Sequence, residues 1–180
     1  MNLANKLTLS RIFMIPVFLI FLIGGVCPEP YGRIAALIIF IAASLTDMLD
    51  GRIARKRNLI TNFGKFMDPL ADKLLVSAAL IAFIELNLIP SWVVIVIISR
   101  EFIITGFRLI AVETGLVLAA GWWGKVKTTI QMVMIAVILI WPDGPVYNIL
   151  GRLLILLALI FTAISGIEYI VKNKDVIGDM

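Results

Sequence analysis

The sequence contains no histidine and only one cysteine. Without imidazole there is no Ser-His-Asp triad and no histidine base or metal ligand, so any base must be a carboxylate, a lysine, a tyrosine or a thiolate. Cys27 cannot form an intrachain disulfide, because the chain has no second cysteine. It also makes a poor lipidation site, since Val26 stands where a small residue is expected before such a cysteine.

Charge is also sparse, with 16 Lys and Arg against 12 Asp and Glu in 180 residues. Hydrophobic residues make up 61% of the chain and the mean hydropathy is +1.05. This apolar share exceeds that of soluble domains. Several apolar runs approach the roughly 20 residues that a helix needs to cross a bilayer. We therefore predict an all-α, polytopic membrane protein with a single domain over residues 1–180.

Six transmembrane helices are predicted from the apolar runs. Their approximate ranges are 8–25, 33–56, 65–86, 90–113, 124–141 and 146–171. The charged start of the first run resembles a signal peptide, but it lacks an A-x-A cleavage site and further spans follow, so we interpret it as a retained helix. The preceding segment, Met1 to Arg11, alternates polar and apolar residues, and we predict that it lies in the membrane interface.

Basic residues cluster in alternate connections of this predicted bundle. They stand at Lys6 and Arg11, at Arg52 to Arg57 with Lys65, at Lys125 with Lys127, and at Lys172 with Lys174. The other connections, Gly24 to Gly32, Asn87 to Pro90 and Pro142 to Pro145, contain turn residues and few basic side chains. Because basic loops favour the cytoplasmic side, both termini are predicted to be cytoplasmic in a multi-pass protein of the cell membrane.

Four aspartates stand close together beside one of these basic connections. They are Asp47 and Asp50, spaced i,i+3, and Asp68 and Asp72, spaced i,i+4. On helices each pair shares one face, so two neighbouring helices can aim four carboxylates at one point. Such a cluster needs cations, and carboxylates suit two ions of Mg²⁺ or Mn²⁺. The alternative is ion pairing of these acids with nearby Arg52, Arg55, Lys56 and Lys73.

The same segment resembles the complete motif of the CDP-alcohol phosphotransferases. The matching residues are Asp47, Asp50, Gly51, Ala54, Arg55, Gly64, Asp68 and Asp72, with every gap in place. The resemblance implies six transmembrane helices, a dinuclear metal site at the cytoplasmic side and release of CMP from a CDP-alcohol. It also implies that Asp47, Asp50 and Asp68 are metal ligands and that Asp72 is both a ligand and the general base.

A CDP-lipid site is expected around this motif. Arg55 suits the donor phosphates as a charged fork, although it can also be a topology charge. Gly51, Ala54 and Gly64 leave room for the nucleotide and its diphosphate. The spacing of Asn5, Thr8 and Arg11 matches the N-terminal segment that helps hold the nucleotide in bacterial members, with an interface anchor as the alternative. The expected CDP-lipid contacts are Asn5, Thr8, Asp50, Gly51, Ala54, Arg55 and Gly64.

Basic residues in the fourth and fifth predicted spans indicate an acceptor that carries phosphate. Arg108 and Lys125 are the first candidates for phosphate contacts, followed by Arg100 and Lys127. The alternative is that these residues serve topology and helix pairing, with Arg100 paired to Glu101. Their segments resemble the branch of the family that makes phosphatidylglycerophosphate, which implies sn-glycerol 3-phosphate as the acceptor.

The predicted reaction transfers a phosphatidyl group from CDP-diacylglycerol to glycerol 3-phosphate and releases CMP. Direct displacement is preferred over a covalent intermediate. Other acceptors within the family, namely inositol phosphate, serine or phosphatidylglycerol, remain alternatives. So do a metal-ion transporter, whose sites typically lie at the membrane midplane in repeated halves, and a lipid-binding scaffold. The family resemblance implies a homodimer, and no nucleic-acid partner is expected.

Overall fold

The structure is a computed structural model that describes residues 3–57, 62–113 and 121–173. Within these ranges the side chains of residues 3–8, 47–57, 62–69, 72, 109, 112 and 113 are outside the described part. The described residues form helices and no strand, which confirms the all-α prediction. Contacts divide the chain into two compact units, Met1–Leu86 and Asn87–Met180. The single domain over residues 1–180 stays a prediction.

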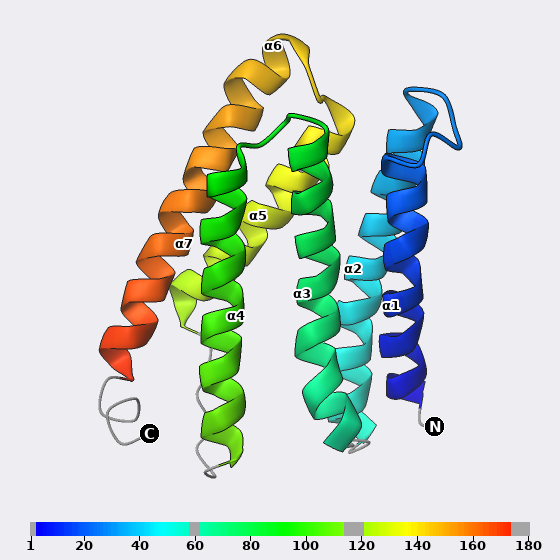
Figure 1. The fold of residues 1–180 in the computed structure, drawn as a ribbon. Helices are drawn as coiled ribbons and strands as arrows, with labels where there is room; N and C mark the ends of the chain where they lie inside the picture. Colours follow the sequence, from blue (N-terminus) through cyan, green and yellow to red (C-terminus); the bar gives the residue numbers. More distant parts are fainter. Residues whose placement is uncertain (1–2, 58–61, 114–120, 174–180) are drawn as a thin grey trace. The chain divides into compact units, whose positions relative to one another are not determined.

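The first unit contains helices α1 (Leu3–Leu22), α2 (Tyr31–Arg57) and α3 (Asn62–Glu85). Figure 1 shows α2 running antiparallel to α1 and α3, and α1 contacts both of the other helices. The rings of Phe18 and Phe40 lie 6.3 Å apart in the core. Fully buried alanines such as Ala36 and Ala79 allow the helix backbones to approach closely.

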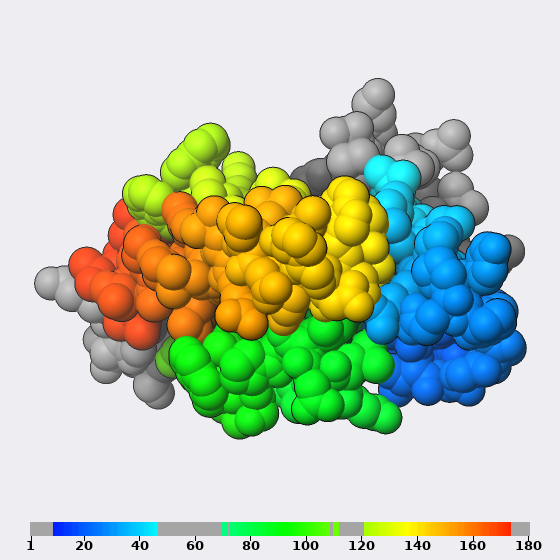
Figure 2. Space-filling view, turned by 90° about the horizontal axis from the view of Figure 1, so that it is seen from above, coloured from blue at the N-terminus to red at the C-terminus, as the bar shows by residue number. Residues whose placement is uncertain are grey.

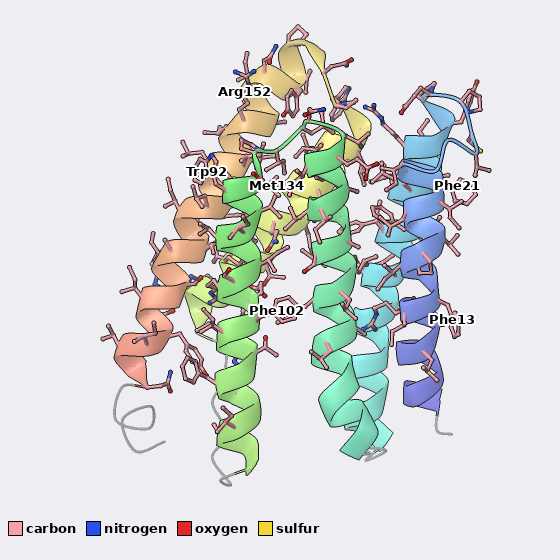
Figure 3. The ribbon with its side chains drawn as sticks, viewed as in Figure 1. Phe13, Phe21, Trp92, Phe102, Met134 and Arg152 are labelled. Carbon is pink, nitrogen blue, oxygen red and sulfur yellow. The ribbon has the colours of Figure 1, made fainter. Side chains whose placement is uncertain are left out.

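The second unit contains α4 (Ser91–Glu113), α5 (Trp122–Ile140), α6 (Gly144–Val146), the π-helical turn η1 (Tyr147–Gly151) and α7 (Arg152–Lys172). The last three elements follow one another as one rod (Figure 1). Helix α7 packs against α4 and α5, and Figure 2 shows the orange side chains of α7 directly against green α4. Met134, labelled in Figure 3, is fully buried in this core.

The π-turn at the start of α7 is fixed by close packing. Tyr147 donates a hydrogen bond from its hydroxyl to the carbonyl of Leu88. Its ring also lies against Gly151, where a Cβ would come within 2.7 Å of the ring atom Cδ2. Only glycine therefore fits at that position without movement of the ring.

Two helical segments among the described residues are long and apolar enough to cross a membrane. They are Trp122–Ile140 and Gly144–Lys172, and only 33% of each apolar window is buried. The core helix of a soluble protein would be mostly buried, whereas Phe13, Trp92 and Phe102 are among many large apolar side chains that point outward (Figure 3). These features indicate a membrane protein.

The helix bounds can be compared with the predicted spans. Ranges 124–141 and 146–171 correspond to the two membrane-length segments. Ranges 8–25, 33–56, 65–86 and 90–113 are helical over most of their length in α1 to α4, but their crossing of a membrane stays a prediction. The described part of the N-terminal segment forms the first turns of α1 and is continuous with the apolar helix that follows.

Candidate functional site

The aspartate motif is divided between two adjoining helices of the first unit. Asp47 and Asp50 lie in the C-terminal half of α2, and Asp68 and Asp72 lie in the N-terminal half of α3. Both segments are helical, so the two members of each pair stand on one side of their helix, as the spacing predicted. Helices α2 and α3 contact one another, and Figure 1 shows the end of α2 near the start of α3.

The metal site itself stays a prediction. The side chains of Asp47, Asp50, Asp68 and Asp72 are outside the described residues, so their convergence is not tested. Among the side chains that are described, no group of three or more acidic or cysteine residues is arranged to hold a metal ion. The helix placement and the all-oxygen donor set of the four aspartates fit hard divalent cations.

The expected CDP-lipid contacts also fall in the first unit. Their helical positions are described but their side chains are not, and they are Asn5, Thr8, Asp50, Gly51, Ala54, Arg55 and Gly64. The start of α1 lies at the same end of this unit as the end of α2 and the start of α3 (Figure 1). One turn further, Arg11 is only 1% exposed. This burial distinguishes Arg11 from an interface anchor, which would extend toward head groups.

A partly buried ion-pair cluster joins α4 to α5 in the second unit. The carboxylate oxygen Oε1 of Glu101 accepts hydrogen bonds from Nη1 of Arg100 at 3.0 Å and from Nζ of Lys127 at 2.5 Å. The side chain of Lys127 is 2% exposed, and those of Glu101 and Arg100 are 14% and 15% exposed. The predicted alternative of an Arg100–Glu101 pair is thus confirmed, and the pairing of Lys127 with the same carboxylate is an additional finding.

Arg108 lies further along α4, against α7. Its guanidinium carbon stands 5.4 Å from the centre of the Tyr169 ring, within the range of a cation–π interaction. Tyr169 is 5% exposed. The sequence interpretation missed this tyrosine, although a tyrosine next to Glu168 in an otherwise apolar final helix is a usable signal.

Several buried polar atoms of this unit lack a hydrogen-bond partner. They are Nε of Arg100, Nε of Arg108, Nε2 of Gln131 and the hydroxyl of Tyr169. Three of these four atoms can only donate a hydrogen bond, so what they lack is an acceptor. A ligand rich in acceptor oxygens, such as a phosphate, would satisfy such atoms.

The four predicted acceptor-phosphate residues differ in how far they are buried. Arg100, Arg108 and Lys127 lie at least partly inside the second unit, and Lys125 is exposed. Arg100 lies against Gly166 of α7, where a Cβ would stand 3.4 Å from Cγ of Arg100, an ordinary contact distance. Gln131, one turn after Lys127 and only 3% exposed, was not predicted as a site residue.

Known proteins of one family match this chain over nearly its whole length. The family model described as CDP-alcohol phosphatidyltransferase matches residues 1–164. A Bacillus subtilis (strain 168) protein named CDP-diacylglycerol--glycerol-3-phosphate 3-phosphatidyltransferase is 48% identical over 97% of this chain and 96% of its own length. A Haemophilus influenzae protein of the same name is 39% identical over 96% of this chain and 94% of its own length.

A relative from a third organism gives a similar match. The protein named probable phosphatidylglycerophosphate synthase of Mycobacterium tuberculosis (strain ATCC 25618 / H37Rv) is 39% identical over 98% of this chain and 84% of its own length. The match of the family model and the near-complete coverage of these relatives agree with the motif on α2 and α3. The chain belongs to the CDP-alcohol phosphatidyltransferase family.

Proposed function

We propose that this protein transfers the phosphatidyl group of CDP-diacylglycerol to sn-glycerol 3-phosphate, giving phosphatidylglycerophosphate and CMP. The observation that carries the proposal is the unbroken motif from Asp47 to Asp72 in a chain that is 48% identical to a relative named for this reaction. The alignment with this relative covers 97% of the chain.

The proposed donor site uses the motif residues of α2 and α3. Asp47, Asp50, Asp68 and Asp72 would hold two divalent ions, Mg²⁺ or Mn²⁺, which neutralise diphosphate charge and stabilise the leaving CMP. Asp72 would also accept the proton of the attacking hydroxyl. Arg55 would bind the donor phosphates, and the small residues Gly51, Ala54 and Gly64 would leave space for the nucleotide. Asn5 and Thr8 complete the proposed nucleotide contacts.

The proposed acceptor site uses the basic residues of α4 and α5. Arg108 would bind the phosphate of glycerol 3-phosphate, together with Lys127 and Arg100, and Lys125 would contribute from the exposed start of α5. The buried donor atoms without partners in this unit support the assignment, because a phosphate offers several acceptor oxygens. The primary hydroxyl of the bound acceptor would then attack the phosphorus attached to diacylglycerol in a direct displacement.

The membrane arrangement completes the proposal. Six transmembrane helices would place both termini and the motif on the cytoplasmic side of the cell membrane, because the basic connections lie at that side. The protein would act as a homodimer within the lipid that supplies its donor.

The proposal is tested with purified protein, CDP-diacylglycerol and a divalent metal, by following CMP release with each candidate acceptor. Glycerol 3-phosphate should support turnover, whereas inositol phosphate, serine and phosphatidylglycerol should not. Asp72→Asn should lower the rate by at least about 100-fold while the protein stays folded, since it removes a general base. Asp143→Asn, at an exposed turn, is the matched control and should keep full activity.

Two results would contradict the proposal. Turnover with a different acceptor and none with glycerol 3-phosphate would overturn the choice of substrate. Unchanged CMP release by a folded Asp72→Asn protein would overturn the catalytic assignment and leave a carrier or scaffold as the better interpretation.

A further inference from the structure

Glu101 is the only acidic partner that the described contacts give to Arg100 and Lys127. Both cations bind the same oxygen, Oε1, although they come from different helices. A shared oxygen brings the two charged groups close together and fixes the side of α4 on which Lys127 of α5 must stand. Glu101 therefore sets the geometry of both cations at once.

Burial raises the free-energy cost of leaving either cation without a carboxylate partner. Lys127 is 2% exposed and its cation would be costly to bury without a nearby carboxylate. The pairing does not use all the donors of Arg100, since a guanidinium carries five N–H groups. Nε of Arg100, for example, is buried and has no hydrogen-bond partner. Arg100 can therefore bind a further anion without releasing Glu101.

The charge of this cluster matches a phosphate. Arg100, Glu101 and Lys127 together carry a net charge of +1, and Arg108, proposed above as a further phosphate contact on α4, brings the proposed site to +2 before the exposed Lys125 is counted. A phosphate monoester carries about −1.5 to −2 near neutral pH. Without Glu101 the net charge would be +3, and the same cations would repel one another more strongly before the acceptor binds.

We infer that Glu101 is a positioning residue for the acceptor phosphate, acting through Lys127 and Arg100 rather than by touching the substrate. The inference rests on the proposed function and adds a specific determinant of acceptor affinity to it. Glu101→Gln keeps the size of the side chain and an acceptor oxygen but removes the charge that holds Lys127. Acceptor binding should weaken, while donor binding and the chemical step should not.

The experiment compares KM and kcat for both substrates in the wild type, Glu101→Gln, Lys127→Gln and the double variant. We expect Glu101→Gln to raise the KM for glycerol 3-phosphate by about tenfold or more, equal to about 1.4 kcal/mol, with the KM for CDP-diacylglycerol and kcat within about twofold of wild type. The loss in the double variant should be smaller than the product of the two single losses, because both changes act on the Lys127–Glu101 interaction. Glu101→Asp, which keeps the charge, should recover part of the affinity.

Glu168→Gln is the matched control. Glu168 is 16% exposed and also accepts a lysine hydrogen bond, from Nζ of Lys172 at 2.6 Å, but that lysine is 64% exposed. The KM of the Glu168→Gln protein for glycerol 3-phosphate should stay at the wild-type value.

The outcomes separate the inference from the proposed function. If wild type releases no CMP with glycerol 3-phosphate, the proposed function fails first. If wild type is active but Glu101→Gln leaves the KM for the acceptor unchanged, or if the losses of the two single variants multiply in the double variant, the positioning role is wrong. A lower kcat in Glu101→Gln with both KM values unchanged would also overturn the positioning role, because that pattern indicates a structural or directly catalytic role.

Discussion

Replacing Tyr169 with phenylalanine and with leucine separates the two contributions of this side chain. The Tyr169 hydroxyl is buried and has no hydrogen-bond partner, whereas its ring lies 5.4 Å from the guanidinium of Arg108. Tyr169→Phe keeps the ring and removes the unpartnered hydroxyl. Tyr169→Leu removes both. The two variants should therefore change the stability of the protein in different ways.

The expected magnitudes follow from these contacts. An unsatisfied buried polar group costs about 1–3 kcal/mol, so Tyr169→Phe should leave the free energy of unfolding unchanged or raise it by up to about 1 kcal/mol. Tyr169→Leu should lower it by about 1–3 kcal/mol: it loses a desolvated cation–π interaction of about 1–2 kcal/mol and about 1 kcal/mol through imperfect repacking, offset by up to about 1 kcal/mol from removal of the hydroxyl. At about 2–4 °C per kcal/mol, the apparent melting temperature should fall by about 2–12 °C.

Thermal unfolding of the purified protein in detergent, followed by the fluorescence of its 4 tryptophans, measures this difference. Tyr31→Leu is a control, because Tyr31 is 67% exposed and its replacement should leave the melting temperature unchanged. If Tyr169→Phe lowers the melting temperature as much as Tyr169→Leu, the reasoning is refuted, since the hydroxyl rather than the ring would then provide the stabilising contact.

Three further predictions address packing, the acceptor site and the metal. Gly151→Ala should destabilise the protein by about 1–3 kcal/mol in the same thermal assay, because its Cβ would stand 2.7 Å from the ring of Tyr147. Gly106→Ala, with open space around its Cβ, should not, and equal effects would contradict the clash. Arg108→Gln should raise the KM for glycerol 3-phosphate by about 10- to 100-fold, from the loss of a charged hydrogen bond of about 1.5–3 kcal/mol, while exposed Arg152→Gln should not change it. Chelation with EDTA should abolish CMP release, and Mg²⁺ or Mn²⁺ should restore it; activity that persists in EDTA would disprove the metal requirement.

Much of the helical architecture could be predicted from apolar runs and their boundaries. Residues 90–113 and 124–141 were predicted as spans, and the observed helices are Ser91–Glu113 and Trp122–Ile140. Pro90 and Gly121 immediately precede these two helices, and such residues commonly mark helix ends. The π-turn at Tyr147–Gly151 could not be predicted, because hydropathy contains no information about which carbonyl each amide selects.

The candidate site shows the same division between local and long-range information. The spacing of Asp47 and Asp50 predicted one side of a helix, and both positions are helical; the predicted pairing of adjacent Arg100 and Glu101 is confirmed. The bond between Lys127 and Glu101 spans 26 residues. It depends on which sides of α4 and α5 meet, and that choice is made by packing of the whole unit rather than by any local pattern.

The low burial of α5 and of the segment Gly144–Lys172 has a consequence for enzyme kinetics. With 33% of each apolar window buried, most of these side chains are free to contact acyl chains. The protein and its proposed lipid donor would then share a two-dimensional phase. Donor availability would follow the mole fraction of CDP-diacylglycerol in the bilayer or micelle, so that adding inert detergent at constant bulk donor concentration should slow turnover.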